Sequence, residues 1–80
     1  MLLALDIGNT SIHMGLWQQE ELTATYRIGV EQEKLPDEYG VLILSLLATG
    51  GLGPEDVEAC IIGCDVPPLI PTFEMVCRKF

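Results

Sequence analysis

The residues with the clearest chemical potential stand near the start of the chain, in the segment Asp6-Ile7-Gly8-Asn9-Thr10. Gly8 and Asn9 tolerate tight turns with positive φ, and Gly8 lets a ligand approach the backbone closely. Backbone amides and the Thr10 hydroxyl can hold phosphate oxygens, while the Asp6 carboxylate can hold the accompanying Mg²⁺, usually through water. The segment predicts a phosphate-binding turn for a nucleotide. A hairpin turn with a capping aspartate explains the same residues, and local chemistry does not separate the two.

The segments around this turn predict three strands. Residues 2–5 are apolar without alternation, which is typical of a strand buried on both faces in a sheet covered by helices. Apolar residues then alternate through 12–16 and through 22–28, so we expect an antiparallel meander. His13 falls on the polar set, which favours a packing or surface role over that of a catalytic base. Arg27 is either a solvated side chain on an outer strand or a phosphate contact.

A helix is predicted to follow, with Pro36 in its first position and acidic residues in its first turn. Its apolar stripe recurs at helical spacing, and Gly50-Gly51 ends it. The stripe consists of Tyr39, Leu42, Ile43, Leu46 and Leu47, widened by Val41 and Leu44. Tyr39 is either a core residue or a ligand contact.

A second inner strand is predicted over residues 57–64, after a single helical turn at 53–56. A right-handed crossover would lay this strand parallel to the first and next to it. Its end would then lie beside Asp6, so Asp65 is either a second acidic group in the same cleft or a helix cap or surface loop residue. The last segment, 69–80, has helical spacing of its apolar residues.

Composition restricts the class of protein. Eighty residues with 49% hydrophobic content allow one small domain or part of one, and the formal charge of -8 argues against nucleic acid or an anionic membrane as a partner. The chain has no apolar run long enough to span a membrane and no basic region typical of a signal peptide, so a cytoplasmic protein is expected. Cys60, Cys64 and Cys77 lack metal-site spacing and are expected to be free thiols.

The order strand, turn, strand, strand, helix, strand, helix resembles the first half of the ribonuclease H-like domain of actin, hexokinase and related acetate and sugar kinases. More narrowly, several stretches are similar to the N-terminus of type III pantothenate kinases. They are Leu5-Asp6-Ile7-Gly8-Asn9-Thr10-Ser11-Ile12, Asp37-Glu38-Tyr39-Gly40, Gly53-Pro54-Glu55-Asp56-Val57 and Val66-Pro67-Pro68-Leu69. The resemblance covers essentially the whole chain and implies an α/β fold, the truncated N-terminal part of an actin-like ATPase domain.

The resemblance also implies ATP-dependent phosphorylation of pantothenate, with Mg²⁺ and a monovalent cation, K⁺ or NH₄⁺, and a homodimer in the longer protein. By this carry-over Asp6 helps to place the metal, and Gly8, Asn9, Thr10 and Ser11 line the triphosphate. Ile7, Ile12 and His13 belong to the same segment and contribute mainly backbone.

The chain departs from the family pattern in two ways. The family's Gly-x-Asp-Arg motif, which carries the catalytic base and pantothenate contacts, has no counterpart, so no catalytic residue is expected within this chain and no turnover by the chain alone. The family usually has a Ser-x-Val-Pro-like sequence before the last helix, whereas Cys64-Asp65 precede Val66-Pro67 in this chain. The added negative charge would weaken nucleotide binding. A transcriptional accessory protein of the same fold and a related kinase with another acceptor remain alternatives.

Overall fold

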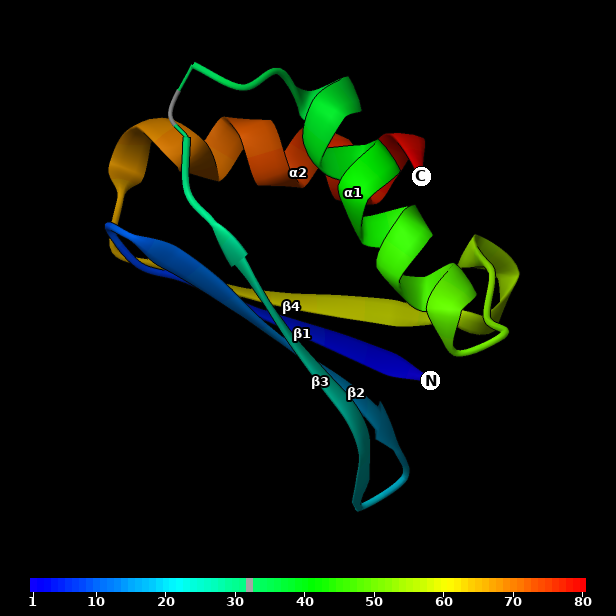
Figure 1. Ribbon diagram of the computed structural model, residues 1–80. Coiled ribbons are helices and arrows are strands. Elements are labelled where there is room, and N and C mark those ends of the chain that lie inside the picture. The colour runs from blue at the N-terminus through cyan, green and yellow to red at the C-terminus, as the bar shows by residue number, and fades with distance from the viewer. Residues whose placement is uncertain (32) are drawn as a thin grey trace.

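A mixed four-stranded sheet carries two helices on one of its faces in the computed structural model, which describes residues 1–31 and 33–80 (Figure 1). The strand order is β3-β2-β1-β4; β1 is antiparallel to β2 and parallel to β4, as the sequence predicts. The elements are β1 (Leu2–Ile7), β2 (Ser11–Gln18), β3 (Glu21–Gly29), α1 (Pro36–Thr49), β4 (Ala59–Cys64) and α2 (Ile70–Lys79), with 3-10 turns at Pro54–Asp56 and Pro67–Leu69.

Helix α1 begins and ends where its sequence signals predict. Pro36 is the first helical residue, and the Leu35 amide donates a hydrogen bond of 2.9 Å to the Glu38 carboxylate, which satisfies an otherwise unpaired group at the helix start. At the other end the helix gives way to Gly50 and to Gly51, whose φ of +76° is a left-handed conformation that suits glycine.

The core lies between the helices and the covered face of the sheet. Tyr39 and Phe73, both fully buried, join the helices with ring centroids 4.6 Å apart, so Tyr39 is a core residue. The buried apolar set comprises Leu3, Leu5, Ile7, Ile12, Met14, Leu16, Tyr39, Ile43, Leu47, Val66, Leu69, Phe73 and Val76. The alternation predicted for the second strand is confirmed by its buried members.

The opposite face of the sheet is open, which corrects two predictions. Burial alternates along β1, so this strand is not buried on both faces, because both helices lie on the same side (Figure 1). Strand β4 is an edge strand rather than an inner one, and its Ile61 is 58% exposed. The predicted widening of the α1 stripe is also wrong at Val41, which points to solvent.

The pairing of β2 with β3 contains an irregularity that displaces Leu22. Leu16 pairs with Ala24, yet the next residue, Trp17, pairs with Leu22, so Thr23 is an extra residue in β3. Such a bulge shifts the alternation by one residue. Leu22 is therefore exposed instead of sharing the inward set of Ala24 and Tyr26, which the sequence pattern had predicted.

Other predictions concern the cysteines and the connections. All three cysteines are free thiols, and no group of three or more potential metal ligands occurs within residues 1–31 and 33–80. Burial and the neighbouring Cys77 thiol raise the pKa of Cys60 to about 12.

Within residues 1–31 and 33–80 no helix is long and apolar enough to cross a membrane. Gln32, in the connection before α1, lies outside the described residues.

Candidate functional site

The turn between β1 and β2 places polar groups at the end of the sheet. The Gly8 amide donates a hydrogen bond of 3.0 Å to the Ser11 carbonyl, which closes the turn, and Asn9 and Thr10 are exposed at its tip. Ile7 and Ile12 flank the turn and pair with each other, and both are fully buried. An exposed tip is therefore held on a rigid, buried base.

The glycine and asparagine of the turn suggested a left-handed backbone conformation, but the turn does not adopt one. Among the described residues, positive φ values occur at Gln19 and Gly51 and not at Gly8 or Asn9. Glycine at position 8 instead leaves space. A Cβ built there would lie 3.5 Å from the Ser11 carbonyl oxygen, with no other atom of the described chain within 4 Å apart from its two chain neighbours. The outer side of Gly8 is thus open for a ligand to approach the backbone.

Two neighbouring segments hold the turn in place. The Val30 amide, just after β3, donates a hydrogen bond of 3.2 Å to the Thr10 carbonyl. The Asp65 amide, just after β4, donates one of 2.9 Å to the Ile7 carbonyl. These bonds tie both sides of the turn to strands that are distant in sequence.

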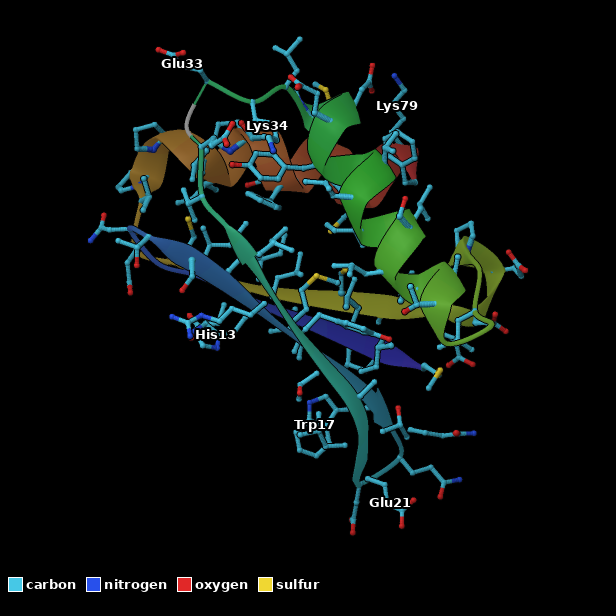
Figure 2. All side chains as sticks on the ribbon, in the orientation of Figure 1. His13, Trp17, Glu21, Glu33, Lys34 and Lys79 are labelled. Atoms are coloured by element: carbon cyan, nitrogen blue, oxygen red, sulfur yellow. The ribbon has the colours of Figure 1, made fainter. Side chains whose placement is uncertain are left out.

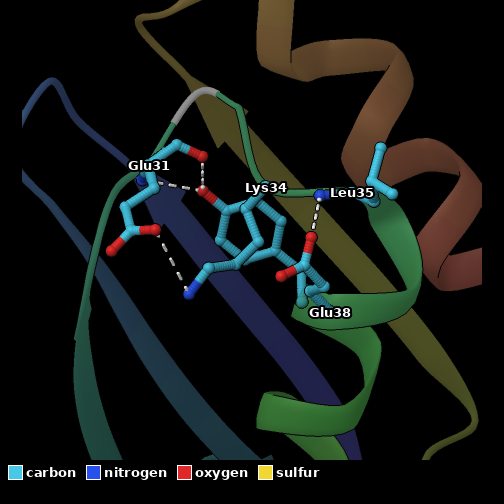
Figure 3. A network of polar contacts seen from close by, with 5 residues as sticks. Glu31, Lys34, Leu35 and Glu38 are labelled. Carbon is cyan, nitrogen blue, oxygen red and sulfur yellow. Dashed lines mark hydrogen bonds and ion pairs between the residues drawn. The ribbon is translucent and has the colours of Figure 1, made fainter.

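Helix α1 in turn fixes the segment that contains Val30. The Tyr39 hydroxyl donates a hydrogen bond of 2.6 Å to the Glu31 carbonyl and accepts one of 2.9 Å from the Glu31 amide. The Lys34 ammonium lies 5.6 Å from the centre of the Tyr39 ring and 3.8 Å from the Glu31 carboxylate (Figure 3). The core tyrosine therefore anchors the segment that supports Thr10.

Asp6 projects from the open face of the sheet, one residue before the buried base of the turn. It is exposed and pairs with His13 of β2 on one side and with Gly63 of β4 on the other. A Cβ at Gly63 would stand 4.0 Å from the Asp6 carboxylate, so glycine leaves that flank of the carboxylate uncovered. Asp6 therefore faces solvent on the open side of the sheet rather than the core.

A hollow of about 630 Å³ opens on this face of the sheet. Its polar end is lined by Asp6, His13 and Arg27, and its other end by the apolar side chains of Trp17, Leu22 and Ile61. His13 and Trp17 lie on the side of the sheet away from the helices (Figure 2). The His13 Nε2 atom lies 3.4 Å from the Ser11 hydroxyl, so the imidazole leans toward the turn.

The second acidic residue, Asp65, is close to the turn through its backbone alone. Its side chain is exposed, and it is not among the residues that line the hollow. It does not cap a helix either, since the residues preceding the 3-10 turn and α2 are Val66 and Leu69. The structure therefore favours the surface-loop alternative for Asp65.

The oxygen atoms in this region suit a divalent cation that takes most of its coordinating atoms from water and a bound phosphate. Asp6 supplies one exposed carboxylate, and the described residues offer no cluster of three metal-binding side chains. Mg²⁺ commonly takes one or two carboxylates and completes its shell with water and substrate phosphates. Asp6 fits that pattern when a phosphate ligand occupies the turn.

Comparisons with known proteins place the chain among kinases. The family model for type III pantothenate kinase matches residues 2–80, and the chain belongs to this family. It is 46% identical over 80 residues to the type III pantothenate kinase of Roseiflexus sp. (strain RS-1). The corresponding identities are 45% for Brevibacillus brevis and 44% for Pelobacter propionicus. In each case the whole chain is covered, but it spans only 31–32% of the relative's length.

Proposed function

We propose that the chain supplies the nucleotide-binding part of an enzyme that transfers the terminal phosphate of ATP to pantothenate, giving 4'-phosphopantothenate in the first step of coenzyme A biosynthesis. The observation that carries this proposal is the family match over residues 2–80, which includes the exposed turn and its carboxylate. The charge of -8 argues against nucleic acid or an anionic membrane as a partner, and the turn amides and a divalent cation would offset its repulsion of an anionic substrate.

In this proposal each residue of the turn has a role that its environment supports. Asp6 holds Mg²⁺, mostly through water, and Gly8, Asn9, Thr10 and Ser11 line the triphosphate. Ile7 and Ile12 are fully buried, which leaves their backbone to act in the site. Mg²⁺, when bound, would neutralise charge on the phosphate oxygens. The family resemblance alone implies a monovalent cation, K⁺ or NH₄⁺, and we assign no residue to it.

The proposed fold is the N-terminal part of a ribonuclease H-like, actin-like ATPase domain. An antiparallel meander followed by a helix and a strand parallel to β1 supports this assignment. The family's Gly-x-Asp-Arg motif has no counterpart in the sequence, so the catalytic base and the acceptor contacts are assigned to the part of the relatives that this chain does not span. The active protein is proposed to be a longer, cytoplasmic homodimer.

A chimeric enzyme tests whether these residues serve a pantothenate kinase. The chain replaces the matching segment of the Roseiflexus sp. enzyme, and transfer of phosphate from ATP to labelled pantothenate is measured with Mg²⁺ and K⁺ present. We expect labelled phosphopantothenate from the chimera and none from the 80 residues alone.

The unmodified Roseiflexus enzyme is the positive control. A folded chimera that forms no phosphopantothenate would refute the proposed role of this chain. Turnover by the 80 residues alone would show that the assignment of the catalytic base elsewhere is wrong.

A further inference from the structure

Arg27 differs from the other basic residues of this acidic chain. The sequence has four lysines and arginines against 12 acidic residues. Lys34, Arg78 and Lys79 each lie within ion-pair distance of a carboxylate, at 3.8, 3.8 and 2.7 Å from Glu31, Glu74 and Asp37. Within residues 1–31 and 33–80, Arg27 makes no such pair. Its guanidinium is therefore the cation of the described chain that is free to meet an anionic ligand.

Strand register places Arg27 in line with the carboxylate of the candidate site. Gly63, Asp6, His13 and Arg27 pair successively across β4, β1, β2 and β3. All four are exposed and line the same hollow on the open face. Because neighbouring strands lie about 4.8 Å apart, the backbones of Asp6 and Arg27 are separated by roughly 10 Å, with His13 between them. The row therefore sets a carboxylate and a guanidinium on either side of His13, on the same open face of the sheet.

The charges in this row complement a metal-bound phosphate. The Asp6 carboxylate alone would repel a triphosphate, and a cation on the far side of the ligand offsets that repulsion. A guanidinium also donates paired hydrogen bonds that match phosphate oxygens. The opposite end of the hollow, with Trp17 and Leu22, offers no charged group. An anion in the hollow would therefore bind at the end near the turn.

We propose that Arg27 is an anion-binding residue that holds oxygens of the terminal phosphate of a nucleoside triphosphate, opposite Asp6. The inference rests on the proposed function, because it places the other phosphates on the Gly8–Ser11 turn. Asp6 would hold Mg²⁺, which would neutralise part of the phosphate charge. Arg27, at the other end of the row, would then hold oxygens of the terminal phosphate.

Binding of inorganic tripolyphosphate to the 80-residue chain tests this inference. Calorimetry with Mg²⁺ present gives the affinity, and NMR spectra of the amides and of the arginine Nε–H groups locate the ligand. We expect Arg27→Gln to weaken binding about tenfold, the loss expected for a charge-assisted hydrogen bond, and Arg27→Lys to fall between. Arg78→Gln removes the same charge from the helical layer and should stay within about twofold of wild type.

Each outcome has a separate meaning. Ligand-induced shifts at Gly8–Ser11 with Arg27→Gln binding as tightly as Arg78→Gln would overturn the Arg27 inference and leave the proposed function standing. Shifts of the Arg27 Nε–H signal without shifts at Gly8–Ser11 would support an anion site and contradict the proposed phosphate turn. An absence of binding to the wild-type chain would refute both.

Discussion

Glycine at position 8 leaves space for a ligand rather than permitting an unusual backbone conformation, because the outer side of Gly8 is open and its φ is not positive. Alanine at position 8 would make an ordinary contact of 3.5 Å with the Ser11 carbonyl. We expect Gly8→Ala to change the free energy of unfolding by no more than about 0.5 kcal/mol. The added methyl should nevertheless weaken Mg·ATP binding by about tenfold or more, because it occupies the side from which phosphate approaches. Denaturant unfolding and calorimetry measure the two effects.

Gly50→Ala is the matched control, since its nearest contact is also 3.5 Å, at the far end of α1. Its ATP affinity should equal that of wild type. If Gly8→Ala also binds ATP normally, the turn does not hold the phosphates.

Residue types and spacing were sufficient to identify the candidate turn, but not its geometry. The turn is shaped by the bond from the Gly8 amide to the Ser11 carbonyl and by support from Val30 and Asp65, all backbone contacts. Side-chain identity carries little information about such bonds. The position of Arg27 beside His13 depends on the register of β2 and β3, and the bulge at Thr23 shows that alternation alone does not fix this register throughout the pair.

At the level of the elements, α1 supports the turn through Tyr39. Tyr39→Phe removes the hydroxyl that bonds both backbone groups of Glu31. We expect the free energy of unfolding to fall by about 1–2 kcal/mol, because two partly buried hydrogen bonds are lost. Hydrogen exchange of the Val30 amide, which is bonded to Thr10, should become faster.

Tyr26→Phe is the control, because no hydrogen bond of the Tyr26 hydroxyl occurs among the described residues. Equal losses of stability in the two variants, with unchanged exchange at Val30, would contradict the supporting role of Tyr39.

Because β4 packs against α2 and buries Cys60, the stability of the fold should decrease at high pH. Burial, together with the Cys77 thiol, raises the pKa of Cys60 from 9.0 to about 12 in the folded chain. The unfolded chain therefore loses this proton first, and the stabilisation is complete below pH 9.0 and lost as pH rises toward about 12.

Urea unfolding at about pH 8 and about pH 11 measures this dependence, and Cys60→Ser removes the titrating thiol. The wild-type chain should lose more stability between these pH values than the variant does. Equal losses would show that Cys60 titrates normally in the folded state.

Element type was predictable because periodicity and end signals agree along the chain. Pro36, the apolar stripe and Gly50-Gly51 predicted α1 with its observed bounds. Burial was less predictable. An apolar sequence, such as that of β1 or β4, allows both faces of a strand to be covered but does not require it. In this structure both helices pack on the same face.

On the scale of the whole molecule, the open face exposes apolar side chains that a longer protein could cover. Ile61 is 58% exposed in the centre of β4. We expect the isolated chain to self-associate through this face at high concentration, since exposed apolar patches promote association. Ile61→Lys should reduce this association, as followed by sedimentation velocity.

Val41→Lys provides a control of equal exposure, 58%, on α1. It should leave association unchanged if the open sheet face is the contact surface. Equal effects of the two lysines would assign the association to net charge instead.

The first turn of the meander, with Asp6, is proposed to bind the phosphates of a metal-bound nucleotide. Mn²⁺ with excess ATP, added to the ¹⁵N-labelled chain, broadens amide signals near the bound metal. We expect selective loss of signals from Asp6 to Thr10 and retention of those from Gln18 to Glu21, the acidic second turn. Asp6→Asn should abolish the effect. Broadening at the second turn, or no broadening at Asp6–Thr10, would contradict phosphate binding at the first turn.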